Sequence, residues 1–370
     1  MSRRFVCTLT VAVALAVCGC WDQQLLKNER TVSIGGMDEA PKGKLRATVS
    51  IRDTTITEAG SKDTSEIHTV VARSTQHARQ KIDEEVSGIY SAAKLRVLLF
   101  GEELVRNHDI MPFLDVYYRD PKSPLSARIA VARGTAEELI RLKMVGDKTI
   151  GLYVDDLLKS MELDAAIPQV NIQTLHPLDR GFDFSLPLLA VKRGVPAVQG
   201  MALFNGIRLT ETLNLDESRV YLLLTGLGKQ NLRMTLQPME KNKSSGYQYV
   251  TINVKKIRRS LKVIVADDQE IQVRLNLKLR VAVEEDPSNH LYKMSVMHNL
   301  ERLLSEELTD NSKKIIRKMQ KAGHDGCGVA RRLMAFHPKL WKRIDWKKEY
   351  PQVRFDTRVS LEIVNTGITQ

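Results

Sequence analysis

Aromatic residues, cysteines and known catalytic motifs are all scarce in this sequence of 370 residues. Aromatic side chains make up 5% of the chain, too few for a surface that stacks nucleic-acid bases, although the formal net charge is +12. Neither the GxSxG pattern of serine hydrolases nor the HExxH pattern of zinc peptidases occurs. The Gly-Lys pair of "TGLGKQN" (225–231) is not a phosphate-binding loop, because Leu223 stands where that loop needs glycine. The sequence therefore marks no enzyme active site and no cofactor-binding site.

His324, Cys327 and His337 form a cluster whose residue types could carry chemistry. They could hold a metal ion, or they could supply a thiol nucleophile and its base. A metal site usually needs four ligands, and no CxxC or HxxxH motif supplies the rest. A Cys–His nucleophile needs a third group to orient the base, and the sequence marks none. We therefore predict no catalytic residue and no metal ligand in the chain, and no enzymatic activity.

The first 19 residues have the pattern of a bacterial export signal. Arg3 and Arg4 precede an apolar run from Phe5 to Val17. The run is too short to span a bilayer, since that takes about 20 apolar residues. The alternative is a buried first helix, but a core helix rarely starts at the fifth residue behind paired arginines. We predict a signal peptide over residues 1–19.

Val17-Cys18-Gly19-Cys20 matches the lipoprotein version of such a signal, with Cys20 as the modified residue. Modification of Cys18 fits worse, because the branched Val17 stands where a small residue is needed. We predict that Cys20 carries diacylglyceryl and N-acyl groups and becomes the first residue of the mature protein. One acyl chain holds a protein only marginally, whereas two anchor it stably. Cys327 is then the last free thiol, so the exported protein has no internal disulfide and depends on its core.

Basic residues are concentrated between positions 313 and 348, a segment in which the acidic residues are Asp325 and Asp345. The basic residues are Lys313, Lys314, Arg317, Lys318, Lys321, Arg331, Arg332, Lys339, Lys342, Arg343, Lys347 and Lys348. A solvated protein surface is the simpler interpretation. The alternative is a surface that faces anionic lipid headgroups, where each Lys or Arg contributes about 1 kcal/mol.

Strands and helices alternate along the first half of the chain. Apolar patterns predict strands at residues 44–52, 66–72, 94–100 and 126–132. Helical periodicity predicts helices at 74–90, 102–107, 110–118 and 151–162, and another after Thr135. Ser74 is the expected N-cap of the first helix. This mixed order, without a strict repeat, indicates an α+β fold with a mixed or largely antiparallel sheet.

Glycine and proline interrupt the pattern near residue 196 and predict a domain boundary there. The segment after it predicts a hairpin that turns at Asn205-Gly206. Two alternating stretches, 249–265 and 270–284, predict strands, and the second is a long strand with one face exposed to water. A long helix at 288–322 and a last strand at 353–364 follow. The length of the chain suggests two or three domains.

Four segments resemble the Ger(x)C family, the lipoprotein C-subunits of bacterial spore nutrient-germinant receptors. They are "CGCWDQQLL" (18–26), "LLFGEELVRNHDIMPFLDVYYRDP" (98–121), "VQGMALFNGIRL" (198–209) and "HDGCGVARRLMAFHPKLWKRIDWKKEYPQVRF" (324–355). The resemblance covers essentially the whole mature chain. The Cys-Trp-Asp start and the late tryptophan segment are its most specific parts.

The resemblance also implies a role for Cys327. Family members typically have Asp, two apolar residues, Gly, an apolar residue and a small one, and then His-Pro and spaced tryptophans. In this sequence these positions are Asp325, Gly326, Cys327, Gly328, Val329 and Ala330, followed by His337, Pro338, Trp341 and Trp346. Cys327 therefore stands where an apolar residue is usual, and we interpret it as a small hydrophobic side chain. Gly326 departs from the family pattern, as does Cys18 in the lipoprotein signal.

The family fold implies an elongated row of about three α/β domains. With the boundaries above, we expect a signal peptide at 1–19, an N-terminal domain at 20–196, a small middle domain at 197–240 that could share strands with its neighbours, and a C-terminal domain at 241–370 with the helix at 288–322. The resemblance further implies no enzymatic activity, no cofactor and no nucleic acid. It implies two integral membrane partners, the receptor A and B subunits, in the inner membrane of the spore. The chain would support assembly or signalling from the outer face of that membrane, held there by lipid on Cys20.

Two other classes of protein remain as alternatives. A lipid-anchored solute-binding protein should have two similar lobes with parallel sheets, and the long alternating strands count against it. A surface enzyme should have a catalytic motif, and the sequence has none.

Overall fold

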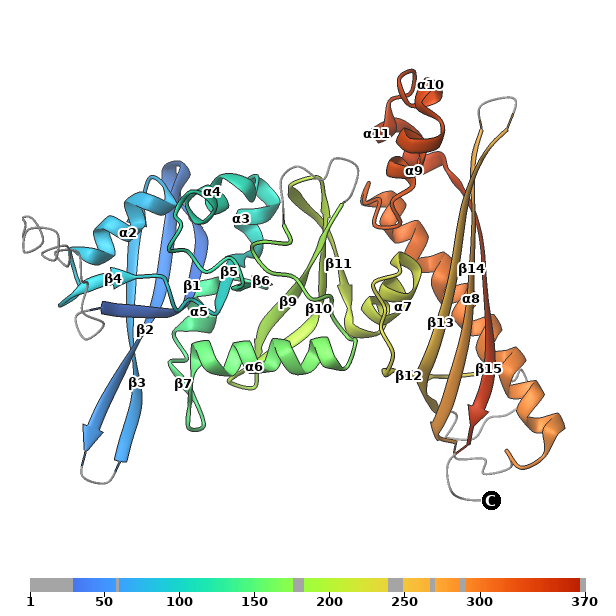
Figure 1. The fold of residues 1–370 in the computed structure, drawn as a ribbon, viewed down its shortest axis with the longest axis horizontal. Helices are drawn as coiled ribbons and strands as arrows, with labels where there is room; N and C mark the ends of the chain where they lie inside the picture. The colour runs from blue at the N-terminus through green and yellow to red at the C-terminus, as the bar shows by residue number, and fades with distance from the viewer. Residues whose placement is uncertain are drawn as a thin grey trace, which may run out of the picture.

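The computed structural model describes residues 29–57, 60–175, 183–238, 249–266, 270–286 and 291–366. Within these ranges, a nine-stranded sheet and a four-stranded sheet lie towards opposite ends of an elongated row (Figure 1). A small hairpin of β7 (Met144–Val145) and β8 (Lys148–Thr149) forms a third sheet. The mixture of helices and sheets confirms the predicted fold class. The predicted signal peptide and Cys20 lie outside the described residues.

The centre of the first sheet is parallel and its two sides are antiparallel. The parallel strands are β1 (Glu29–Ala40), β5 (Val97–Gly101), β6 (Arg128–Ala132) and β9 (Ser185–Lys192). The antiparallel strands are β2 (Lys44–Thr57) and β3 (Gly60–Ala72) beyond β1, and β10 (Val195–Asn205) and β11 (Arg208–Asn214) beyond β9. The short β4 (Ile89–Ser91) also pairs with β1. The sheet is therefore mixed, as the sequence predicts.

Helices cover both faces of the first sheet, as parallel strands require. On one face lie α2 (Thr75–Asp83), α3 (Glu102–Asn107) and α4 (Met111–Arg119), and on the other α5 (Ala136–Ile140) and α6 (Ile150–Leu163). All residues of β5 are buried, as expected of a strand that is covered by helices on both faces. Leu98 and Phe100 point into the first core, and Val97 and Leu99 point into the second. The first sheet is thus the middle layer of three.

Within the described ranges, the second sheet has helices on one face only. Its order is β12 (Leu232–Leu236), β13 (Val250–Val265), β14 (Ile271–Glu285) and β15 (Arg354–Asn365). The chain passes from β14 to the parallel β15 through α8 (Met294–Lys321), α9 (Val329–Phe336), α10 (Pro338–Trp341) and α11 (Trp346–Glu349). α8 lies within the predicted helix 288–322 and buries Leu304, Leu308 and Met319 against the sheet. Alternate residues of β14 are buried and exposed, which confirms the predicted wet face.

Residues 197–240 contribute to both sheets. β10 and β11 complete the first sheet, α7 (Leu215–Thr225) follows, and β12 pairs with β13 in the second. The predicted boundary at residue 196 falls inside β10, just after the turn at Arg193-Gly194, where both φ angles are positive (53° and 79°). The second predicted boundary, at residue 240, lies outside the described residues. The division of the chain into three domains at these points stays a prediction.

Most predicted elements are present, and the structure adds several that the sequence does not predict. Ser74 caps α2 and accepts a hydrogen bond from His77 N at 3.2 Å, as predicted. The helix ends at Asp83 and not at residue 90, because the chain turns there to form β4 against β1. The sequence does not predict strands β1, β4, β7, β8, β9 and β12, or helices α7, α9, α10 and α11.

Candidate functional site

A buried histidine joins the first sheet to the segment that follows α8. His324 is completely buried, and its Nδ1 lies 2.6 Å from the carbonyl oxygen of Phe204 at the end of β10. Its Nε2 lies 2.9 Å from the hydroxyl of Tyr221 on α7. Because a carbonyl oxygen only accepts, Nδ1 carries the proton, and the Tyr221 hydroxyl donates to Nε2. Burial lowers the pKa of His324, so the imidazole is a neutral structural bridge.

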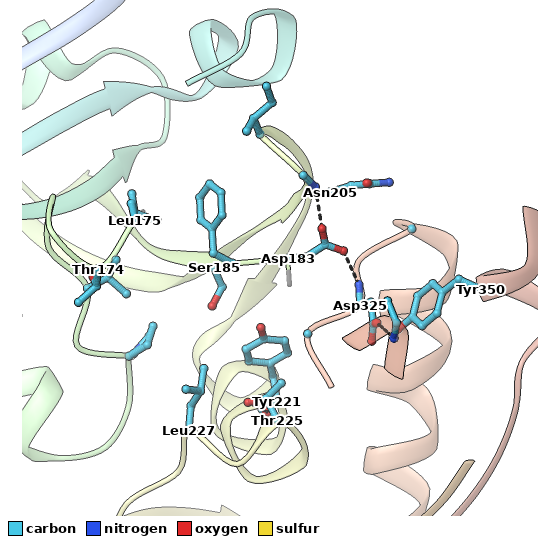
Figure 2. Close-up of a pocket in the computed structure, with 18 of the residues that line it drawn as sticks. Thr174, Leu175, Asp183, Ser185, Asn205, Tyr221, Thr225, Leu227, Asp325 and Tyr350 are labelled. Carbon is cyan, nitrogen blue, oxygen red and sulfur yellow. Dashed lines mark hydrogen bonds between the residues drawn. The ribbon is translucent and has the colours of Figure 1, made fainter. Parts of the chain in front are cut away.

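The carboxylate of Asp183 makes a second bridge across the same junction (Figure 2). Its Oδ1 accepts the backbone N–H of Gly206 at 2.7 Å, in the turn between β10 and β11. Its Oδ2 accepts the backbone N–H of Asp325 at 2.5 Å, in the segment before α9. One side chain thus ties the β10–β11 turn to the C-terminal helices.

Asp325 holds the start of α9. Its carboxylate oxygens accept hydrogen bonds from the N–H groups of Val329 (3.0 Å) and Ala330 (2.7 Å). These N–H groups lie in the first turn of α9, where the helix itself offers no acceptor. Burial raises the pKa of Asp325 to about 7, although these hydrogen bonds act in the opposite direction. The hydroxyl of Tyr350 donates to the carbonyl oxygen of His324 at 2.8 Å and holds the same segment from the other side.

The close approach of these side chains explains why residue 326 is glycine. A Cβ atom at Gly326 would lie 2.6 Å from Nε2 of His324 and 2.7 Å from the hydroxyl of Tyr221. Such contacts are far shorter than van der Waals distance, and the buried rings have no room to move. Glycine in place of the apolar residue that the family pattern has at position 326 therefore leaves room for the Tyr221–His324 hydrogen bond.

Cys327 packs against the C-terminal end of α7. Its Sγ lies 3.7 Å from the carbonyl oxygen of Leu224, which also accepts Nε of Arg259 at 2.6 Å. α7 ends at Gly226 in the left-handed conformation, so this carbonyl lies in the last turn, where helical partners are missing. Burial raises the pKa of Cys327 to about 12, so the thiol is protonated at neutral pH and is not a nucleophile.

The structure does not assemble Cys327, His324 and His337 into a reactive site. Both ring nitrogens of His324 are used by Phe204 and Tyr221. His337 lies at the junction of α9 and α10, where its backbone N–H bonds to Leu333 O. Across the described ranges, no group of three His, Cys, Asp or Glu side chains is placed to hold a metal ion.

A cavity of about 1020 Å³ lies beside this junction. Its walls come from the loop before β9, the β10–β11 turn, α7 and the helices α9 to α11. Aromatic rings form one side: the ring centroids of Trp341 and Trp346 are 5.9 Å apart, and those of Trp346 and Tyr350 are 5.3 Å apart. Figure 2 shows the side chains of Ser185 and Tyr221 pointing towards one another at its base. The carboxylates of Asp183 and Asp325 at its edge accept backbone N–H groups, so the cavity is mainly an apolar space between structural elements.

Two family models together match nearly the whole chain. The model described as "Spore germination protein N-terminal domain" matches residues 22–191. The model described as "Spore germination B3/ GerAC like, C-terminal" matches residues 199–367. This chain belongs to the Ger(x)C family of spore germination proteins.

Relatives of this Ger(x)C chain match over nearly its full length at low identity. Spore germination protein GerQC of Bacillus cereus is 22% identical over 100% of both chains. Spore germination protein B3 of Bacillus subtilis (strain 168) is 19% identical over 95% of both. The crystal structure of the GerBC protein matches with a TM-score of 0.56 and 17% identity, over 89% of this chain and 96% of that one. The structural match shows that the fold is shared.

Sequence reasoning found part of this junction in the Ger(x)C chain and missed the rest. It singled out His324, Asp325 and Cys327, but not Asp183 or Tyr221. Tyr221 stands in the apolar run "VYLLL" and resembles an ordinary core residue, and Asp183 is a single carboxylate before a strand. No signal at the sequence level pairs these residues with positions more than 100 residues away. The lipid attachment at Cys20 lies outside the described residues and stays a prediction. None of the helices in the described ranges is long and apolar enough to cross a membrane.

Proposed function

We propose that this Ger(x)C protein is a non-enzymatic, lipid-anchored subunit of a spore nutrient germinant receptor. The observation that carries the proposal is the match of both spore germination family models, which together extend from residue 22 to residue 367. The subunit supports assembly or signalling with the integral membrane A and B subunits. It acts at the outer face of the inner membrane of the spore, where the receptor triggers germination.

The junction supports a structural role and not a catalytic one. Its polar groups make backbone hydrogen bonds or bond to one another, and Cys327 is a buried, protonated thiol. These hydrogen bonds account for the polar side chains of the junction through the fold alone. The alternative, a solute-binding lipoprotein, would have two similar lobes with parallel sheets. Here one sheet is mixed and the other pairs three of its four strands in antiparallel fashion.

The anchor and the membrane partners can be tested together in spore membranes. The mature N-terminal peptide should begin at Cys20 and carry a diacylglyceryl group by mass spectrometry. The tagged chain should co-purify with the A and B subunits after detergent extraction. Cys20→Ala should weaken the attachment of the chain to the membrane, because the acyl chains on Cys20 are the only covalent lipid that the proposal supplies.

Cys18→Ala is the matched control, because Cys18 leaves with the signal peptide and its loss should not change anchoring. A mature start at another residue, or an unmodified Cys20, contradicts the anchor. Recovery of the chain without either membrane subunit contradicts the receptor assignment.

A further inference from the structure

The outer face of the second sheet is strongly basic. α8 packs on its inner face, and the alternate residues of β13, β14 and β15 point outwards. Between residues 256–264, 272–280 and 354–362, the exposed outward cations are Lys256, Arg258, Lys262, Arg274, Lys278, Arg280, Arg354 and Arg358. The outward carboxylates in these ranges are Asp356 and Glu362. We call these cations the basic sheet face.

The strand register places like charges directly opposite one another on this face. Lys256 pairs with Arg280, Arg258 with Lys278, and Lys262 with Arg274. Like charges at directly opposed positions destabilise an antiparallel pair. Two of these pairs are neighbours on the face, and the Ser260–Asn276 pair separates them from the third. Stability of the fold does not account for three such pairs, whereas a binding partner of opposite charge would.

In the described part of the chain, half of these cations have an ion pair and half have none. Arg280 pairs with Glu362 at 3.2 Å, Arg274 with Asp356 at 3.8 Å, Arg354 with Glu270 at 2.7 Å and Arg358 with Asp356 at 3.5 Å. For Lys256, Arg258, Lys262 and Lys278, the described part of the chain provides no ion pair. A hollow of about 310 Å³ is lined by four of the cations, Lys256, Arg258, Lys278 and Arg280, and by one carboxylate, Glu362. The face thus presents exposed cations around a shallow depression.

The composition of the face indicates which kind of anion it fits. No aromatic side chain projects from it among the described residues of the three ranges. Energetic centres of protein interfaces are rich in Trp and Tyr and poor in Lys, and single-stranded nucleic acid needs aromatic rings for stacking. A broad, aromatic-free array of Lys and Arg suits a layer of phosphate groups at a membrane surface.

We propose that the basic sheet face binds the headgroups of anionic phospholipids. Figure 1 shows β13, β14 and β15 near one end of the row and β1, the first described strand, in the other half. A contact through this face would attach the protein to the membrane at a point far along the molecule from β1. The inference goes beyond the proposed function and does not rest on it.

The test measures binding of the mature chain, residues 20–370, to vesicles. Cys20→Ala keeps the chain free of acyl groups, so that binding reports the protein surface alone. Vesicles of phosphatidylcholine are compared with vesicles that also contain phosphatidylglycerol. The variant K256Q/R258Q/K278Q removes three cations of the basic sheet face. Because each cation near an anionic membrane gives about fivefold in affinity, the variant should bind about 100-fold more weakly to the anionic vesicles.

The control K339Q/K342Q/R343Q removes three exposed cations in α10 and directly after it, within the basic region 313–348. It should keep most of the binding, and it separates the two basic surfaces. Unfolding in urea checks that the first variant is folded, and loss of like-charge pairs should leave its midpoint unchanged or higher. If it does not fold, single changes Lys256→Gln and Lys278→Gln replace it, each with an expected loss of about fivefold.

Three results would overturn the proposal. They are equal binding to both kinds of vesicle, equal loss in the variant and the control, and unchanged vesicle binding of a variant that no longer co-purifies with the membrane subunits. The last result would assign the face to an acidic protein. The vesicle assay contains no receptor subunit, so it can fail while the receptor assignment stands.

Discussion

Replacement of Asp183 by asparagine should weaken the junction between the first sheet and the C-terminal helices. The carboxylate accepts two backbone N–H groups, from Gly206 and from Asp325. Asparagine offers one oxygen and one NH₂ group, so one of these N–H groups must then face another donor. A hydrogen bond to a charged acceptor contributes about 1.5–3 kcal/mol. Asp183 is half-buried, so water can replace part of the lost contact, and we expect Asp183→Asn to cost about 1.5–2 kcal/mol.

The loss can be followed by tryptophan fluorescence during unfolding in urea. Trp341 and Trp346 line the cavity beside the junction and report on it directly. Asp345→Asn is a matched control, because Asp345 also accepts a backbone N–H, from Lys347, but it is exposed and caps a four-residue helix. Asparagine and aspartate cap helices about equally well, so the control should change the free energy of unfolding by less than about 0.5 kcal/mol. Equal effects of the two substitutions, or no effect of Asp183→Asn, would refute the assigned role of Asp183.

Two further substitutions test the buried groups of the junction. Cys327→Ala should cost about 0.5–3 kcal/mol in unfolding free energy and leave nutrient-triggered germination intact, whereas loss of germination in a folded variant would mean that the thiol has a chemical role. The folded-state pKa of Asp325 is raised to about 7, against about 3.9 in an unfolded chain, so the folded state holds a proton that the unfolded state has released. The protonated Asp325 therefore contributes fully to the free energy of unfolding below about pH 4. This contribution is lost as the pH rises through 7, by up to about 1.4 kcal/mol per pH unit. The difference in unfolding free energy between wild type and Asp325→Asn should fall over this window in pH-stepped urea titrations, and a constant difference would contradict the raised pKa.

Elements with a clear apolar period could be predicted from the sequence. The strict alternation in β14 identified both its strand conformation and its wet face, because one face of that strand packs on α8 and the other meets solvent. Asn205-Gly206 identified the β10–β11 hairpin in the same way. The order of strand, strand, helix and strand in the C-terminal part also follows from local patterns.

β1 could not be predicted, because it lies in the middle of the first sheet and is buried on both faces over most of its length. Its sequence, "ERTVSIGGMDEA", has neither alternation nor a continuous apolar run. Gly36 is needed there for close packing, since a Cβ atom would lie 2.7 Å from Ala136 Cβ. The need for glycine at position 36 thus comes from α5, a helix about 100 residues further along the chain. The junction around His324 escaped prediction for the same reason, because its partners Phe204 and Tyr221 come from other elements.

The measurement that tests the account most directly is germination of spores that lack this Ger(x)C protein. The strain must be one in which a single receptor serves the chosen nutrient, so that other receptors do not hide the defect. The account predicts that these spores ignore that nutrient and still germinate with agents that bypass nutrient receptors, because the proposed receptor subunit would be needed only for nutrient detection. A normal response to the nutrient, or equal failure with nutrient and bypass agents, would contradict it.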